Sequence, residues 1–289
     1  MQIEIPDVAP GASSDQETMA TLVLAACGFA ISLAVAWLIA QRARHGLPAV
    51  DRRPQGPVPW NGADVAAAVL SFLGFQVLAA ECMPAEASLQ LRLAAGSTAM
   101  LAATAVTAAH LRLRGAGWPT LGFGLGHLRD DAWLAIAGLG LLLAPLLALA
   151  AVLDRFVPYR HAIVDFLNAH RDPLSIGLVV FAAVVAAPVT EEFLFRRVLQ
   201  GWLERSFERE GPRWGGVTAI VLSSLAFAAA HVGQGIAWVP LFFFGLVVGY
   251  LAKQTGSIVP GIILHGLFNG FSVAMVLMQV GAPEMAGGG

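Results

Sequence analysis

Two adjacent carboxylates, Glu191 and Glu192, directly follow an apolar stretch that covers residues 174–190. A carboxylate can act as a general base on water or can bind a metal ion. Arg196 follows Glu192 at the four-residue spacing that lets opposite charges pair on a helix, and it lies about 140° around the helix from Glu191. We therefore predict that Glu192 pairs with Arg196 and that Glu191 faces the interior of a helix bundle or a water-filled cavity. In the alternative interpretation, the helix has left the membrane at Glu191 and both carboxylates are interfacial charges.

Two further motifs place polar side chains in apolar stretches near the C-terminal end. The segment FAAAH carries Phe227 and His231 on one helical face, and HGLFN carries His265 and Asn269 in the same way. A lone histidine in such a stretch is often only hydrogen-bonded to a neighbouring helix, whereas ionisable and amide groups on several spans favour a functional site. Small residues that would allow close helix approach lie nearby, namely Gly245, Gly249, Gly261, Gly266 and Gly270.

The composition is that of a membrane protein. Hydrophobic residues make up 57% of the chain and charged residues 12%, about half the charged fraction of a typical soluble domain. The net charge of −2 gives no basic field for nucleic acid. Eight apolar stretches approach the length of a membrane span, and we predict an all-α, polytopic membrane helix bundle of about eight transmembrane helices. The stretches cover residues 19–40, 63–80, 93–109, 132–152, 174–190, 215–231, 236–252 and 258–280.

The chain divides into three predicted parts. Residues 1–18 are a polar N-terminal tail, residues 19–152 are N-terminal scaffold helices, and residues 174–280 are the functional core, because polar groups become denser from the fifth stretch onward. Basic residues are enriched in the cytoplasmic loops of membrane proteins. We therefore place both termini outside, because all 17 Lys and Arg residues except Arg92, Arg155, Arg160 and Arg171 then lie on the cytoplasmic side. All but Lys253 are arginines, which together with abundant Ala and Gly is typical of a bacterial chain. We therefore expect a multi-pass protein of the cytoplasmic membrane.

The three motifs together resemble those of a known family. EEFLFR, FAAAH and HGLFN are similar to the EExxxR, FxxxH and HxxxN/B motifs of the CPBP family, the CAAX-processing and bacteriocin-processing (Abi) group of intramembrane endopeptidases. Their order, internal spacing and placement on successive spans agree with that family over about residues 174–275. One departure is Arg197, where relatives usually carry glycine. The resemblance implies an intramembrane endopeptidase that hydrolyses peptide bonds of membrane-associated peptides or proteins, with the lipid bilayer and a membrane-tethered peptide as its partners.

Peptide hydrolysis requires an activated water, a stabilised oxyanion and a proton for the leaving amine. No GxSxG nucleophile motif occurs in the chain. In line with the resemblance, we assign Glu191 as the general base and His231 as the residue that orients the water. His265 and Asn269 would donate hydrogen bonds to the oxyanion. The residues expected to support the site structurally are Glu192, Arg196 and Phe227.

A metal mechanism would use the same side chains. Glu191, His231 and His265 form a His₂Glu set, which suits a catalytic zinc with an open fourth position. Against zinc, no HExxH motif places two histidines on one helix, and Asn269 is a poor zinc ligand. We therefore favour the glutamate mechanism without a cofactor and keep the zinc-dependent metalloprotease as the alternative.

Two functions of other classes use similar residues. A proton-coupled transporter would also carry intramembrane Glu and His, but it would be expected to show inverted repeats or paired broken helices, and the sequence shows neither. A non-catalytic immunity or scaffold protein would be expected to have lost one of Glu191, His231 or His265.

One conflict concerns depth, because the predicted span ends place Glu191 and His231 about 20 Å apart across the membrane. The motif agreement indicates that these ends are displaced by several residues.

Overall fold

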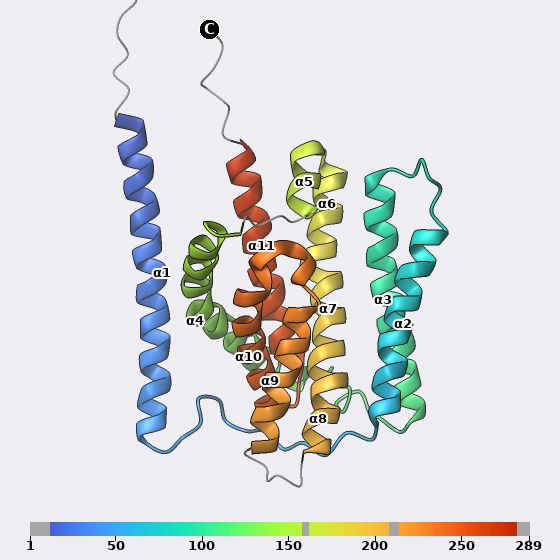
Figure 1. Ribbon diagram of the computed structural model, residues 1–289. Coiled ribbons are helices and arrows are strands. Elements are labelled where there is room, and N and C mark those ends of the chain that lie inside the picture. Colours follow the sequence, from blue (N-terminus) through green and yellow to red (C-terminus); the bar gives the residue numbers. More distant parts are fainter. Residues whose placement is uncertain (1–11, 158–161, 208–213, 282–289) are drawn as a thin grey trace, which may run out of the picture.

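The computed structural model describes residues 12–157, 162–207 and 214–281. Within these residues the fold is all-helical (Figure 1), as the composition predicts. Among the described residues, seven helices are long and apolar enough to cross a membrane, which confirms a multi-pass helical bundle in a lipid bilayer. They cover Thr21–Arg44, Gly62–Glu81, Leu89–Leu113, Leu125–Asp154, Pro173–Ser206, Val232–Thr255 and Val259–Met278. The sixth predicted stretch forms a shorter apolar helix, Trp214–Ala229.

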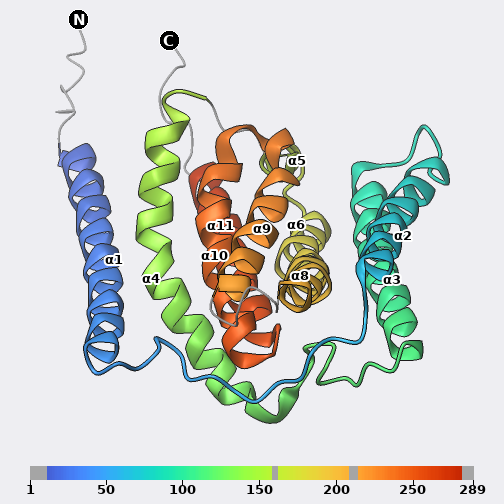
Figure 2. The same ribbon diagram turned by 60° about the horizontal axis from the view of Figure 1, so that its bottom comes forward.

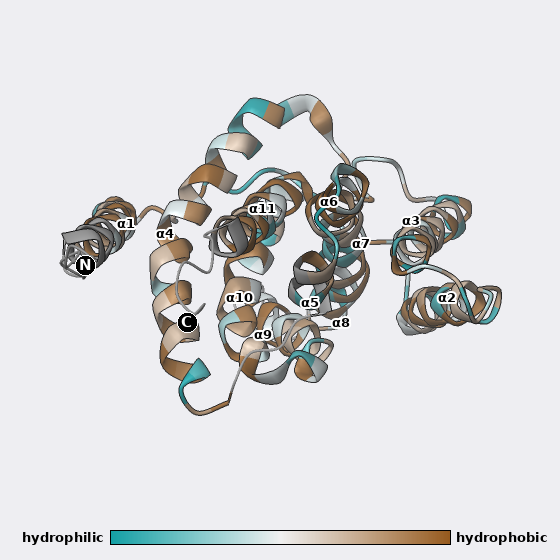
Figure 3. Cartoon of the chain, turned by 90° about the horizontal axis from the view of Figure 1, so that it is seen from above, coloured by the Kyte–Doolittle hydropathy of each residue, from teal (hydrophilic) through white to brown (hydrophobic). Residues whose placement is uncertain are grey.

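The N-terminal helices form the outer part of the bundle (Figures 2 and 3). Helix α1 (Ala12–Arg44) lies along α4 (Leu128–Asp154), where Ser32 Oγ donates a 2.8 Å hydrogen bond to the carbonyl oxygen of Gly140. Helices α2 (Gly62–Glu81) and α3 (Leu89–Leu113) form a hairpin on the opposite side of the core. Residues 12–18, predicted as part of the polar tail, belong to α1, and residues 1–11 lie outside the described residues. These helices expose large apolar side chains, as lipid-facing surfaces do.

The fifth span is one long composite helix. It contains α6 (Pro173–Val180), the π-helical segment η2 (Phe181–Ala186), α7 (Ala187–Glu191), a second π-helical segment η3 (Glu192–Leu199) and α8 (Gln200–Ser206). The sequence-based end at residue 190 was therefore wrong, because the helix continues past the charged residues and places Glu191 near its middle. Arg196 and Arg197, counted above among the cytoplasmic loop residues, are only 2% and 8% exposed. Segments of π-helix in a long helix often occur at functional sites.

The remaining helices bring the second and third motifs to the same depth. The short helix α5 (Ala162–Ala169) precedes the long composite helix. Helix α9 (Trp214–Ala229) ends early, and the 3₁₀ segment η5 (Val232–Ala237) turns the chain into α10 (Trp238–Thr255). This turn needs Gly235, whose φ of 71° favours glycine. Helix α11 (Val259–Gly281) then packs between α4 and the composite helix. The expected separation of Glu191 and His231 across the membrane was wrong, because the fifth span continues to Ser206 and Glu191 lies near its middle, 3.9 Å from His231.

The linker between α1 and α2 packs against the core at the lower end of the bundle in Figure 1. Trp60 is fully buried there and donates from Nε1 to the carbonyl oxygen of Val198 at 3.0 Å. Arg205 donates to the carbonyl oxygen of Trp60 at 3.0 Å. The guanidinium of Arg197 lies over the Trp60 ring at 5.6 Å, and its Nε donates to the carbonyl oxygen of Thr120. The unusual arginine after the EExxxR motif therefore attaches the composite helix to two surrounding loops.

Candidate active site

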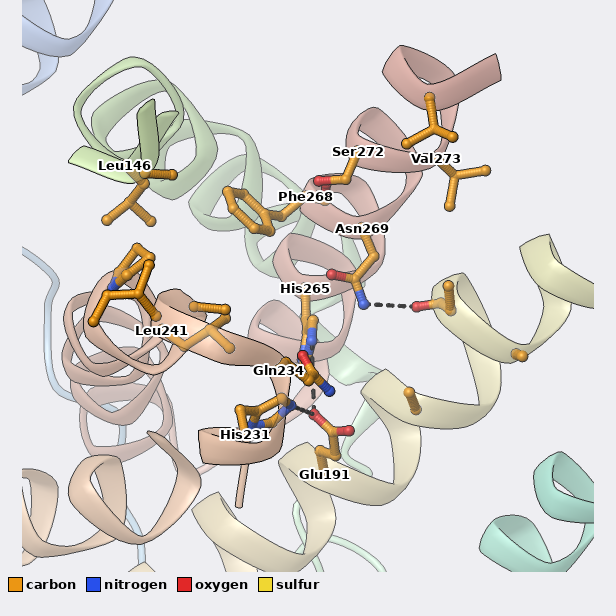
Figure 4. A pocket seen from close by; sticks show the side chains of 18 of the residues that line it. Leu146, Glu191, His231, Gln234, Leu241, His265, Phe268, Asn269, Ser272 and Val273 are labelled. Atoms are coloured by element: carbon orange, nitrogen blue, oxygen red, sulfur yellow. Dashed lines mark hydrogen bonds and ion pairs between the residues drawn. The ribbon is translucent and has the colours of Figure 1, made fainter. Parts of the chain in front are cut away.

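Glu191 lies at the end of α7, immediately before the π-helical segment η3. Its Oε2 atom is 3.9 Å from Nε2 of His231 and 3.8 Å from Nε2 of His265 (Figure 4). The Glu191 side chain is 18% exposed, and its Oε2 has no hydrogen-bond partner among the described residues. The structure therefore directs one carboxylate oxygen toward two imidazoles that come from two other helical segments.

His231 directly follows the last turn of α9, and its ring orientation is set by backbone and aromatic contacts. Its Nδ1 lies 2.8 Å from the carbonyl oxygen of Phe227, so Nδ1 carries the proton and donates, because a carbonyl oxygen can only accept. The Nε2 atom then faces Glu191. The Phe227 ring packs against the His231 ring at 4.8 Å.

Phe227 also joins the other two motifs. It is fully buried, meets the ring of His265 edge to face at 5.9 Å, and carries the guanidinium of Arg196 over its face at 4.9 Å. One aromatic side chain thus contacts the histidine of its own motif, the histidine of the third motif and the arginine of the first motif. The regular spacing within FAAAH predicted the Phe227–His231 pair, but spacing within one helix gives no information on the contacts to other helices.

His265 and Glu192 form a buried pair. Nδ1 of His265 lies 3.0 Å from Oε1 of Glu192, and Oε2 of Glu192 lies 3.4 Å from Nε of Arg196. The contact between Glu192 and Arg196 was predicted from their spacing, whereas the contact to His265 was missed. Besides its contact with Arg196, Glu192 therefore orients the His265 imidazole that faces Glu191. A carboxylate that accepts from Nδ1 leaves Nε2 of the ring directed toward the cavity.

Asn269 lies one turn after His265 on α11. Its Nδ2 donates a 2.8 Å hydrogen bond to the carbonyl oxygen of Ala183 in the π-helical segment η2 (Figure 4). A side-chain amide has two N–H donors, so this bond leaves one donor available. The structure thus brings together all four side chains that were assigned to the chemistry, and all four line one cavity.

The cavity has a volume of about 780 Å³. Its walls come mainly from α3, α4, α10, α11 and the composite helix, and most of them are apolar, with Leu146, Leu241 and Phe268 among the lining side chains. The polar side chains of the lining include Arg92 and Asp154 as well as Glu191 and the two motif histidines. Gln234, held in the irregular turn η5, lies beside Glu191 and His231 (Figure 4). Sequence reasoning missed Gln234 because it follows the second motif in a segment without periodic spacing.

The Glu191 carboxylate and the two histidine Nε2 atoms are of types that bind a metal ion, but they lie far apart. Glu191, His231 and His265 present one oxygen and two Nε2 atoms, and each Nδ1 is held by an oxygen acceptor, as is common for zinc ligands. Ligands of a tetrahedral zinc lie about 3.3 Å apart, less than the 3.8–3.9 Å found here. Within the described part of the chain, no group of three His, Cys, Asp or Glu residues could hold a metal ion as placed.

Two glycines on α11 allow a sharp test of how the third motif is positioned. A Cβ atom at Gly266 would lie 2.9 Å from the carbonyl oxygen of Val184, whereas one at Gly270 would lie 3.6 Å from the Val184 side chain, an ordinary contact. We expect Gly266→Ala to force α11 away from η2 and to reduce the free energy of unfolding by about 1–3 kcal/mol. Gly270→Ala should leave stability unchanged or raise it by up to about 1 kcal/mol. Thermal unfolding of both variants in detergent measures this, and equal stability of the two would contradict the close packing.

Comparison with known proteins finds relatives of the segment that holds the site. The family model described as "Type II CAAX prenyl endopeptidase Rce1-like" matches residues 173–271, which hold all three motifs. A relative named "Membrane-embedded CAAX protease MroQ" from Staphylococcus aureus (strain USA300) is 31% identical over 114 residues. That match covers 39% of this chain and 44% of the relative, so the chain spans less than half the length of that protein. No solved structure matches the chain. The segment 173–271, which carries all three motifs, is therefore similar to the CAAX-type membrane endopeptidases.

Proposed function

We propose that this protein is an intramembrane endopeptidase that hydrolyses peptide bonds of membrane-tethered peptides or proteins by means of a glutamate-activated water. One observation carries the proposal: Oε2 of Glu191 lies within 4 Å of the Nε2 atoms of both motif histidines, in a mostly apolar cavity inside a membrane bundle. The family match and the relative named as a membrane-embedded CAAX protease support it.

In the proposed reaction, the Glu191 carboxylate accepts a proton from water, and the water oxygen forms a bond to the peptide carbonyl carbon. His231 orients that water, because its Nε2 faces the same carboxylate oxygen. The C–N bond then breaks as the C=O double bond re-forms, and the leaving amine takes up the proton that Glu191 accepted from water. Both steps require these groups within hydrogen-bond reach of the reacting atoms, which the cavity allows.

The oxyanion would be stabilised by His265 and Asn269. Asn269 has one amide N–H left after its bond to Ala183. Nδ1 of His265 lies against the Glu192 carboxylate, so Nε2 is the ring nitrogen that faces the cavity, and it would donate to the oxyanion when it carries a proton.

A zinc-dependent metalloprotease is the second candidate, because both histidines present Nε2 toward Glu191 with Nδ1 held. Glu191, His231 and His265 would hold the metal, and zinc would supply a Lewis acid and a more acidic bound water. The wide spacing of these donors favours the glutamate mechanism.

Chelation separates the two candidates. We expect hydrolysis of a membrane-tethered peptide by the purified protein to stay within about twofold of its initial rate after prolonged incubation with a tight zinc chelator, because the carboxylate itself is the base. A zinc protease treated in parallel serves as the control. Loss of activity followed by recovery on return of zinc would instead make Glu191 a metal ligand.

A further inference from the structure

A row of buried polar side chains extends away from the cavity behind Glu192. Nη1 of Arg196 donates to Oγ of Ser223 at 3.3 Å, and that hydroxyl lies 3.2 Å from Oε1 of Gln200 and 3.1 Å from the carbonyl oxygen of Ile220. Nε2 of Gln200 donates onward at 2.9 Å to the carbonyl oxygen of Gly249. Arg196, Ser223 and Gln200 are at most 2% exposed. The row therefore connects α9 and α10 with the composite helix at the level of the first motif.

Three glycines make room for this row. A Cβ atom at Gly261 would lie 3.0 Å from Oε2 of Glu192, one at Gly245 would lie 3.2 Å from Nη2 of Arg196, and one at Gly249 would lie 2.9 Å from Oε1 of Gln200. Each of these distances is shorter than nearly all Cβ contacts in proteins. The backbones of α10 and α11 thus closely surround the three polar groups, which restricts how these side chains can move.

Arg196 is the link between this row and the cavity. Its guanidinium is planar and carries five donors in a fixed arrangement, so the acceptors around it determine its orientation. Within the described residues these are the Glu192 carboxylate and the Ser223 hydroxyl, and the Phe227 ring covers one face. Glu192 in turn holds Nδ1 of His265. A displaced guanidinium would therefore displace the carboxylate that orients His265.

We propose that Ser223 and Gln200 are positioning residues that act on His265 through Arg196 and Glu192. The inference rests on the proposed function, since it assigns the two residues to the same reaction. Neither residue contacts the cavity, so their effect should appear in the rate of the chemical step and not in substrate binding.

Ser224 provides a matched control for Ser223. Both serines are fully buried and adjacent on α9, but the hydroxyl of Ser224 has no hydrogen-bond partner among the described residues. We expect Ser223→Ala to lower kcat about tenfold at unchanged KM, the effect of losing one hydrogen bond to a charged group. Ser224→Ala should keep kcat within about twofold of the original protein. Thermal unfolding of both variants shows whether they are equally well folded.

A double variant tests whether the two residues act in one chain. Gln200 reaches Arg196 through Ser223, so Gln200→Met should lower kcat by about threefold and should add nothing further in the Ser223→Ala background. Independent effects that multiply would overturn the inference. A wild-type kcat in Ser223→Ala, or equal losses of kcat in Ser223→Ala and Ser224→Ala, would also overturn the inference. In each case Glu191→Gln would still be inactive. Full activity in Glu191→Gln would instead refute the proposed function itself, which keeps the two failures distinct.

Discussion

The Glu191→Gln variant is expected to lose about a hundredfold to ten-thousandfold in kcat while it folds as the original protein does. Glutamine keeps the size of the side chain and removes the base, and a positioned general base contributes about 10²–10⁴ in rate. Stability should change little, because Oε2 of Glu191 makes no hydrogen bond within the described residues and lies 3.8–3.9 Å from the histidines. Initial rates on any peptide that the original protein cleaves, together with thermal unfolding in detergent, measure both parts.

Retained activity in Glu191→Gln would remove Glu191 from every catalytic role. Loss of activity together with loss of folded protein would instead show that the carboxylate holds the bundle together. The unfolding midpoint of Glu191→Gln separates the two results, and we expect it to match that of the original protein.

The same substitution one residue later should have a different effect. Glu192→Gln is expected to reduce the free energy of unfolding by about 3 kcal/mol, because it leaves the buried guanidinium of Arg196 without a countercharge. The side chains of Glu192 and Arg196 are each 1% exposed, so solvent does not screen their interaction. Activity should also fall, since Glu192 holds Nδ1 of His265.

Glu191→Gln is the matched control for this second prediction, because it makes the same chemical change at the neighbouring position. Comparison of unfolding midpoints in one detergent decides the result. If Glu192→Gln were as stable as Glu191→Gln, the ion pair with Arg196 would contribute nothing to the fold, and the division of tasks between the two glutamates would be wrong.

Motif spacing predicted much of the candidate site. His265 and Asn269 lie on one face of α11, and the pairing of Glu192 with Arg196 follows from the same four-residue spacing. Phe227 and His231 also contact each other, although His231 lies past the end of α9. These residues are close in the sequence, so a local pattern gives sufficient information on them.

The depth of the site could not be predicted from hydropathy. A run of Glu192, Arg196 and Arg197 reads as the end of a span, because charge is costly in a bilayer. In the structure these charges are compensated inside the protein, where Glu192 pairs with Arg196, and Phe227 and Trp60 cover the two guanidinium groups. The helix therefore continues to Ser206. Contacts of this kind join helices that are distant in the sequence, so a local window does not contain them.

Contacts between segments also account for the other differences. Residues 52–60 are rich in proline, which is typical of an exposed linker. Trp60 in that segment is nevertheless fully buried against Val198. In the same way, the bond between Glu192 and His265 joins α11 to the composite helix, and no spacing within either helix indicates it.

The most direct measurement of the central claim is hydrolysis of a library of membrane-tethered peptides by the purified protein in detergent, with cleavage products identified by mass spectrometry. Glu191→Gln, prepared and assayed in parallel, is the control. We expect the original protein to produce defined pairs of new termini and Glu191→Gln to produce none of them. Equal cleavage by both proteins, or no cleavage of any peptide by the folded original protein, would contradict it.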